Sequence, residues 1–561
     1  MMDREKNVAI MDPGKNSRIG MRSTSARSWE FPAGEVSSVE QNREDHAPHH
    51  LQRNFKARHV QMIGLAGCIG SGVFISTGEA LQTGGAFGLL IAYPLICSMA
   101  LAMLTVLSEA TCLFPTTGSF IDHASRFVDP ALGFAIGFCE WFGAITVVAA
   151  EGSVFPVVIS YWTTSVSYAG LMTIYLVVVF AFHVMPNRWF AEFEFYSGIV
   201  KLTLMVAVML TMVAICAGAG NGDAYIGQNY NTLEVFPNGF KNQGIARCFL
   251  LASWATGGQE IMGIVAGEAG FPRWDLPRAR VNLFIRILVI YLSAAVFISV
   301  LVPYTEPLLL STSNLAASPF VIAMNYAGIR VLPDILNVVL LICLCGIGSE
   351  ELFVASRVQV AMADMGMMPA MFKKIDSRGR PWASLLCCSI IAIALTYMCL
   401  NTTGAIAFNW FSSISATTTF FAWMIIPLTN WCMLRALRAQ GDTAWSERYA
   451  YKSWLWPAIP LYLFVTTLFT FVCTFWVAVD PIGGADSSGL AADFFEIMLC
   501  FPLFVFAYIA YKLFYRTKFQ NPKTADLITG RRRLTTENIE FLDAYTASPW
   551  YRKALSYARF G

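Results

Sequence analysis

The sequence predicts an all-α membrane protein with about 12 transmembrane helices. Three observations carry this prediction: the composition, the length of the apolar runs, and the distribution of Lys and Arg. Of 561 residues, 56% are hydrophobic and only 14% are charged, whereas roughly a quarter of a soluble globular chain is charged. Because much of a soluble protein's surface must stay polar, the chain needs lipid as its solvent.

Apolar runs that could cross a bilayer follow one another along most of the chain. A spanning helix needs about 20 mostly apolar residues. On this criterion, spans are expected near 60–80, 86–108, 131–160, 167–186, 192–217, 245–268, 282–303, 332–356, 383–401, 404–432, 454–479 and 490–515. The segment 317–328 is expected to form a short helix on the extracellular surface.

Lys and Arg gather in alternate loops, and cytoplasmic loops of membrane proteins carry an excess of them. The loops near 273–280, 373–380 and 435–452 are basic, whereas 218–244 and 304–331 are poor in Lys and Arg. Both termini are therefore predicted to be cytosolic. No basic domain indicates a nucleic-acid partner. The expected organisation is a disordered N-terminal tail at 1–58, a membrane domain at 59–515 and a C-terminal tail at 516–561.

Two spans contain sequences that favour a break in the helix. The first span has the glycine-rich run at 67–72, and the sixth has Gly257 and Gly258. Each glycine costs roughly 1 kcal/mol relative to alanine inside a helix. Small residues also let helices pack closely, which is the alternative explanation. However, the first and sixth spans are equivalent positions in two five-helix halves, which is typical of inverted-repeat transporters with a site between the halves.

Several motifs then match a known family in order and spacing. They are GSGVF at 70–74, PTTGSF at 115–120, AGEA at 266–269, ASR at 355–357 and DLITGR at 526–531. The chain resembles the fungal amino acid permeases of the amino acid–polyamine–organocation superfamily, from about Arg53 to Arg533. This resemblance implies a LeuT-type 5+5 inverted repeat, with repeats at about 59–217 and 245–432 followed by two further helices at 454–515. It also implies proton-coupled uptake of amino acids at the plasma membrane, with no cofactor.

The two breaks offer groups that suit an amino acid zwitterion. Unwinding at Gly70-Ser71-Gly72 would expose N–H groups at a helix N-terminus, whose partial positive charge favours a carboxylate. The sixth span would present carbonyls to the ammonium. By resemblance, Trp254 would be an aromatic gate, although it could also be a core aromatic. The predicted substrate-binding residues are Ile69, Gly70, Ser71, Gly72, Glu151, Trp254, Ala255, Thr256, Gly257 and Glu260.

Ala255 and Gly257 depart from the family pattern, because many relatives have serine and a bulkier residue there. The smaller side chains are expected to widen the pocket, which leaves the identity of the substrate open. Carriers of polyamines, choline or γ-aminobutyrate are an alternative, favoured by the additional acid Glu140. A non-transporting amino acid sensor is another. The chain has no recognisable nucleophile–base set of an enzyme.

Lys201 lies inside an apolar run of the fifth span. A lysine at a helix centre costs about 2.5–3.5 kcal/mol on insertion scales, so it is a functional candidate. The resembling family has lysine at this place, where it can stand in for a coupling sodium ion. The alternative is that its ammonium extends to the interface. Glu268 is the second predicted proton-coupling residue, although it could instead pair with Arg273.

The remaining expectations concern other carboxylates and the tails. Glu140, Glu350 and Glu351 are further intramembrane acids that should face the cavity or a cation, because a carboxylate facing lipid is not tenable. Lys6 and Lys15 are candidate ubiquitin attachment sites. Ubiquitin ligase or trafficking factors are therefore possible partners of the tails, beside the amino acid, the proton and the lipid bilayer.

Overall fold

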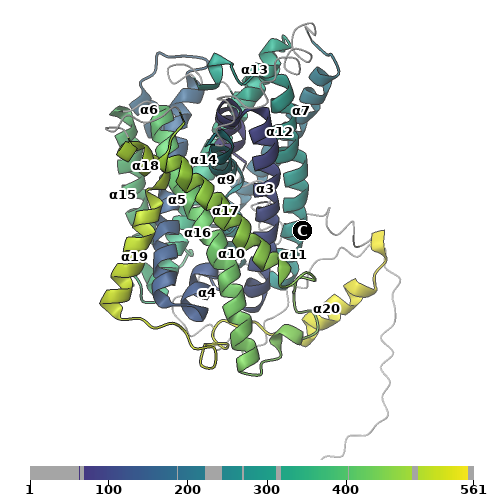
Figure 1. The fold of residues 1–561 in the computed structure, drawn as a ribbon, viewed down its shortest axis with the longest axis vertical. Helices are drawn as coiled ribbons and strands as arrows, with labels where there is room; N and C mark the ends of the chain where they lie inside the picture. The colour runs from purple at the N-terminus through teal and green to yellow at the C-terminus, as the bar shows by residue number, and fades with distance from the viewer. Residues whose placement is uncertain are drawn as a thin grey trace, which may run out of the picture.

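The chain folds into a bundle of long helices, as the computed structural model shows (Figure 1). No strand occurs in the part of the chain that the structure describes. That part comprises Met62, residues 69–185, 187–220, 243–267, 271–310, 318–401, 404–482 and 490–551, and Lys553.

The first half of the bundle contains two long spans that follow each other without a loop. Gly85 has a φ of +66°, a left-handed conformation that glycine adopts without strain, and there the chain turns from the first span into the second. The helices of this half are η1 (Gly72–Ser76), α3 (Thr77–Leu113), α4 (Ser119–Phe127), α5 (Pro130–Ile159), α6 (Tyr168–Val184) and α7 (Asn187–Cys216).

The second half begins with a broken span and continues with three long ones. Its helices are α9 (Gln243–Thr256), α10 (Ile261–Gly267), α11 (Pro272–Arg286), η2 (Ile287–Leu292), α12 (Ser293–Leu301), α14 (Val331–Asp364), α15 (Trp382–Met398) and α16 (Gly404–Ala439). Short helices lie in the connections: η3 (Pro307–Leu310), α13 (Pro319–Tyr326), η4 (Ala370–Lys373), η5 (Cys399–Asn401) and η6 (Ala444–Ser446). α13 confirms the short helix expected at 317–328.

The last helices are α17 (Ala458–Val479), α18 (Leu490–Met498), α19 (Cys500–Tyr515) and α20 (Thr536–Ala547). α18 and α19 together have the length of one span but are bent by 69° at the break. The sequence pattern predicted neither this bend, nor the amphipathic helix α4, nor the helix α20 in the C-terminal tail.

The described helices agree with the predicted 12 spans. Seven are long and apolar enough to cross a membrane, and the bent α18–α19 pair makes up to eight. One of the seven, Gly72–Leu113, contains two spans because of the turn at Gly85. The shorter apolar helices α6 and α15 and the broken α9–α10 pair supply the others. The protein is a multi-pass membrane protein.

The seventh span starts earlier than the predicted 282, because the helix begins at Pro272. The first two turns carry Arg273, Asp275 and Arg278, all buried, and charged residues hide a helix from a hydropathy criterion. The guanidinium carbon of Arg278 lies 3.1 Å from the centroid of the Trp274 ring, so this aromatic side chain covers it.

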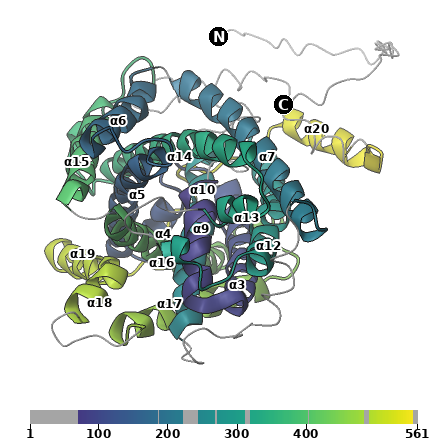
Figure 2. The same ribbon diagram turned by 90° about the horizontal axis from the view of Figure 1, so that it is seen from above.

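The centre of the bundle is formed by α3, α5, α9, α14 and α16. α5 packs along both α14 and α16, and α9 packs along α3. Seen from above, α6, α15, α17, α18 and α19 lie around these helices at the periphery (Figure 2). The breaks in the first and sixth spans therefore lie in the interior.

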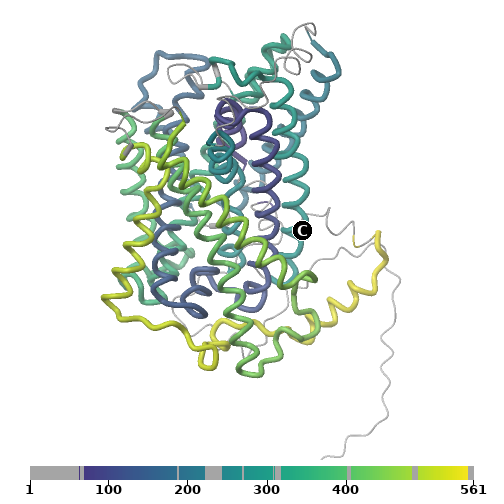
Figure 3. Tube along the Cα trace, in the orientation of Figure 1, coloured from purple at the N-terminus to yellow at the C-terminus, as the bar shows by residue number. Residues whose placement is uncertain are grey.

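The chain after α19 crosses one end of the bundle, which we call the lower end (Figure 3). There the Arg532 N–H donates to the Leu113 carbonyl at 3.1 Å, and the Gln520 N–H donates to the Val128 carbonyl at 2.9 Å. Arg531 bridges Asp442 and Glu447. The C-terminal tail thus connects elements of both halves at the same end.

Candidate substrate site

The break in the first span lies at Ile69 and Gly70, which are not helical. The Gly70 carbonyl accepts hydrogen bonds from Val73 and Phe74 N–H, at 3.1 and 3.4 Å. The helix that starts here, η1, is of the π type, which is frequent at functional sites. Its N-terminus carries partial positive charge.

The glycines at this break allow two broken spans to touch. A Cβ on Gly72 would lie 2.5 Å from the Cα of Ala255 in α9, and a Cβ on Gly70 would lie 1.8 Å from Cδ1 of Ile347 in α14. Close helix packing, the alternative explanation of these glycines, is therefore part of their role. The packing also places the Gly72 backbone beside the end of α9.

The break in the sixth span is shorter than the sequence suggested. α9 remains helical through Thr256, so Trp254 and Ala255 lie in its last turn. The chain then turns at Gly258, whose φ is +79°. The Ser253 carbonyl accepts the Gly257 N–H at 2.7 Å. The C-terminus of α9, with its partial negative charge, points into the same region as the N-terminus of η1.

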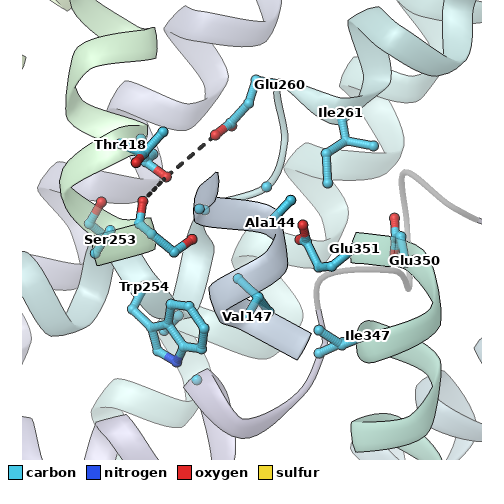
Figure 4. A pocket seen from close by; sticks show the side chains of 18 of the residues that line it. Ala144, Val147, Ser253, Trp254, Glu260, Ile261, Ile347, Glu350, Glu351 and Thr418 are labelled. Atoms are coloured by element: carbon cyan, nitrogen blue, oxygen red, sulfur yellow. Dashed lines mark hydrogen bonds between the residues drawn. The ribbon is translucent and has the colours of Figure 1, made fainter. Parts of the chain in front are cut away.

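A cavity lies where these two breaks meet, and we call it the central cavity (Figure 4). Its volume of about 60 Å³ is room for a few waters, at roughly 10–15 Å³ each. It is lined by Ser71 and Gly72, by Glu140, Gly143, Ala144, Val147 and Glu151 of α5, and by Ser253, Trp254, Ala255, Gly257, Gly258, Glu260 and Ile261. Its other walls are Ile347, Glu350 and Glu351 of α14 and Ser415, Ala416, Thr418 and Thr419 of α16.

Glu151 connects α5 to the first break. Ser71 Oγ donates to Glu151 Oε1 at 2.6 Å, and the glutamate is 1% exposed. The other oxygen, Oε2, is buried and has no hydrogen-bond partner. A buried acceptor without a partner is costly, so Oε2 is a natural point for a ligand to bind.

Glu260 accepts a hydrogen bond at each of its two carboxylate oxygens, whereas Glu151 accepts one at only one oxygen. Thr419 Oγ1 donates to Oε1 at 3.4 Å, and Trp423 Nε1 donates to Oε2 at 3.1 Å. A Cβ on Gly257 would lie 3.2 Å from Thr419 Oγ1. The glycine expected to widen the pocket therefore also makes room for the threonine that bonds Glu260.

Three further carboxylates line the central cavity: Glu140, Glu350 and Glu351. Glu350 and Glu351 occupy adjacent positions of α14, and both are labelled in Figure 4. Among the described residues, no hydrogen bond or ion pair joins these three side chains to a partner. The sequence had identified all three as acids that should face a cavity, but not their convergence with Glu151 and Glu260.

Two donors also line the central cavity without a hydrogen-bond acceptor. They are Ser253 Oγ, on a side chain that is fully buried, and Trp254 Nε1. The Trp254 indole also packs edge-on against Phe408, with ring centroids 5.8 Å apart. Trp254 is thus both a cavity wall and part of an aromatic contact.

Lys201 is buried in α7, with 1% of its surface exposed. Its Nζ lies 3.9 Å from Oε2 of Glu194 on the same helix. A Cβ on Gly346 would lie 2.8 Å from the Nζ, so the ammonium faces α14 beside Ile347 of the cavity wall. This geometry disagrees with a side chain that extends to the lipid interface. Sequence reasoning missed Glu194, although its spacing of two helical turns from Lys201 was a usable signal.

The predicted substrate-binding residues separate into two groups. Those that line the central cavity are Ser71, Gly72, Glu151, Trp254, Ala255, Gly257 and Glu260. Ile69, Gly70 and Thr256 adjoin the breaks but do not line it; the Thr256 hydroxyl donates to the Ala252 carbonyl instead. Glu268 lies outside the described residues.

A family model described as "Amino acid permease" matches residues 59–523. The chain belongs to the amino acid permease family. It is 32% identical over 495 residues to the probable amino-acid permease meu22 of Schizosaccharomyces pombe, covering 87% of this chain and 85% of that one. It is also 32% identical to the general amino-acid permease GAP2 of Candida albicans, covering 90% and 86%. These relatives are named as permeases, not enzymes.

Another relative is the S-adenosylmethionine permease GAP4 of Candida albicans, with 31% identity over 88% of this chain and 80% of that one. Among solved structures, the chain aligns with a manganese transporter of Eremococcus coleocola at a TM-score of 0.47 and 12% identity. That alignment covers 82% of this chain and 95% of the other. The all-helical fold and the permease sequence family together agree with the LeuT-type arrangement expected from the sequence.

Proposed function

We propose that this permease is a secondary active symporter that carries an amino acid with a proton across the plasma membrane by alternating access. The observation that carries the proposal is the pair of helix breaks that touch at Gly72 and Ala255, with a cavity between them. Broken helices are tolerated at membrane depth where they line a cavity.

The central cavity offers both signs of partial charge that a zwitterion needs. The substrate carboxylate would bind at the N-terminus of η1, near Ser71 and Gly72, with Trp254 Nε1 or Ser253 Oγ as further donors. The ammonium would bind at the C-terminus of α9 and to Glu151 Oε2. Each of these groups lines the cavity, which supports the assignment.

Lys201 and Glu194 would couple transport to the proton. Their atoms lie 3.9 Å apart in a buried setting, and Gly346 places them beside the helix that carries Ile347 and Glu350. A buried lysine changes its protonation readily. Loss of a proton from this pair would alter its packing against α14 and so communicate with the cavity wall. The proton gradient is the driving force, and we propose no cofactor.

Uptake into proteoliposomes tests the proposal directly. Purified protein would be reconstituted with a pH gradient, acidic outside, and supplied with radiolabelled amino acids one at a time. We expect concentrative uptake that an uncoupler abolishes. Lys201→Ala should retain exchange of substrate at equal pH but lose uptake driven by the gradient. Full gradient-driven uptake by that variant would reject the coupling role.

A carrier of polyamines or choline is the second candidate, because the central cavity contains five glutamates. It predicts that spermidine or choline, and not an amino acid, drives uptake in the same vesicles. The tails remain a separate proposal: Lys6 and Lys15 as ubiquitin sites lie outside the described residues. A ubiquitination assay that compares the wild type with the Lys6→Arg, Lys15→Arg variant would test it, and unchanged modification of the variant would reject these sites.

A further inference from the structure

We propose that the central cavity selects amino acids with a positively charged side chain, and that Glu140 and Glu351 bind that charge. The inference rests on the proposed function, since it names the substrate class of the same site. It follows from the charges of the wall, from unpartnered polar atoms in it, and from the places of the five glutamates.

The wall of the central cavity is acidic without compensation. Five glutamates line it, and among the described residues that line it there is no Lys or Arg. Charges of like sign that face one cavity repel each other strongly in a low-dielectric interior. A bound cation relieves this repulsion, whereas an anionic substrate adds to it. An aspartate or glutamate substrate is therefore disfavoured.

Unpartnered buried atoms show that the wall is arranged for a ligand. Glu151 Oε2 and Ser253 Oγ belong to side chains with 1% and 0% exposure, both line the central cavity, and neither atom has a hydrogen-bond partner. One is an acceptor and the other can donate. A substrate with both an ammonium and a carboxylate would satisfy the two together.

The other three glutamates differ in what surrounds them. Glu260 already accepts hydrogen bonds from Thr419 and Trp423. Glu350 lies near the buried pair of Glu194 and Lys201, where the glutamate repels it and the lysine attracts it. Glu260 therefore has hydrogen-bond donors of its own, and Glu350 has a cation in its surroundings.

Glu140 and Glu351 remain as the acids without such a partner. They come from α5 and α14, which pack against each other, and both line the central cavity. Ser253 belongs to α9 at the breaks, whereas Glu140 and Glu351 belong to α5 and α14. A substrate whose amino acid end lies at the breaks would therefore direct its side-chain cation toward Glu351 and Glu140.

A polyamine fits this wall less well than a basic amino acid. The donors Ser253 Oγ and Trp254 Nε1 and the N-terminus of η1 need an acceptor. A polyamine has only cationic donors and would leave these groups unpaired. A basic amino acid supplies a carboxylate for them and a second cation for the glutamates.

Arginine and citrulline provide the sharpest comparison, because they have nearly the same shape and differ in the charge of the side chain. Both substrates need the cavity to widen by a similar amount. The ratio of their kcat/KM values therefore reports the charge of the side chain and not its size. We would measure kcat/KM for both in proteoliposomes of the wild type, Glu140→Gln, Glu351→Gln and the double variant. Glu537→Gln, an exposed glutamate of α20, is the matched control.

We expect the wild type and Glu537→Gln to prefer arginine at least about tenfold, a difference of about 1.4 kcal/mol. Each cavity variant should lower the ratio severalfold, and the double variant should bring it near one while citrulline uptake persists. Equal uptake of both substrates by the wild type would overturn the inference and leave the proposed function intact. A preference for arginine that the double variant keeps would also overturn it. Uptake of spermidine but of no amino acid would reject both.

Discussion

The central cavity and the lower end both contain many charged side chains, but they pair them differently. At the lower end several acids that the structure describes meet a base: Asp122 pairs with Arg126 at 2.8 Å, Asp442 with Arg531 at 2.5 Å, and Asp129 with Lys512. In the central cavity five glutamates meet no lining Lys or Arg within the described chain.

This difference separates structural charges from functional ones. The ion pairs of the lower end connect the C-terminal tail to loops of both halves, so their charges are satisfied by the fold itself. Intramembrane acids without a partner are expensive and mark sites of substrate or ion passage. The Lys201–Glu194 pair lies between these cases, because it is paired yet fully buried.

The largest effect is expected at this buried pair. Lys201→Met leaves Glu194 buried without its ammonium, and breaking such a pair costs about 3–5 kcal/mol. The double variant Lys201→Met, Glu194→Gln removes both charges and should recover much of that loss, although not the coupling to the proton. Thermal unfolding of the purified variants in detergent measures this. Additive losses in the double variant would show that the two side chains act separately.

The contact between the two breaks gives the next effect. Gly72→Ala places a Cβ against the backbone of Ala255 and should cost about 1–3 kcal/mol of stability as overpacking. Gly70→Ala meets only the end of the Ile347 side chain, so adding Ile347→Ala should relieve it. Denaturation and uptake would be compared for the two single glycine variants and for each of them combined with Ile347→Ala. Relief of Gly72→Ala by the same Ile347→Ala change would contradict this contact map.

His123 in α4 makes stability at the lower end depend on pH. Burial lowers its pKa to about 4, although Asp122 and the Phe114 carbonyl favour the protonated form. Because the unfolded histidine titrates near 6.5, stability should fall by about 1 kcal/mol between pH 7.5 and 5.5. His123→Gln should flatten thermal stability over this range. A wild-type pH dependence in that variant would exclude His123 as its source.

Arg531 gives the smallest expected effect and the cleanest contrast with the cavity. It is partly exposed and bonds Asp442 and Glu447. Arg531→Ala should lower stability by about 1 kcal/mol or less, since such pairs are screened by water. The ratio of arginine to citrulline uptake should stay at the wild-type value. A changed ratio would mean that the lower end also shapes selectivity.

The sequence was sufficient to predict the spans and part of the wall of the central cavity. Apolar runs located the helices, and the glycines at Gly70, Gly72 and Gly257 located both breaks. The start of the seventh span was not predicted, because the helix begins with charged residues that lower its hydropathy although they are buried. Thr419 and Trp423 escaped for a different reason: an apolar run does not show which of its polar positions faces a site far away in sequence.

The convergence of the glutamates on the central cavity could not be predicted from the sequence alone. Glu140 and Glu351 lie on different helices and far apart in the sequence, and only the packing of α5 on α14 brings them to one cavity. Their residue types were visible in the sequence, but their common target was not. The spacing of Glu194 and Lys201 on one helix was visible in the sequence, but their common position beside Gly346 was not.

Equilibrium binding to the purified protein tests the central claim, that the central cavity is the amino acid site. The measurement would use the radiolabelled amino acid that the wild type takes up fastest, with Glu151→Gln and the exposed Glu537→Gln compared at equal monodispersity. Glu151 lines the central cavity and accepts a hydrogen bond from Ser71, and its Oε2 has no hydrogen-bond donor. The account predicts at least tenfold weaker binding by Glu151→Gln, about 1.4 kcal/mol, and wild-type binding by Glu537→Gln. Unchanged affinity in Glu151→Gln would contradict it.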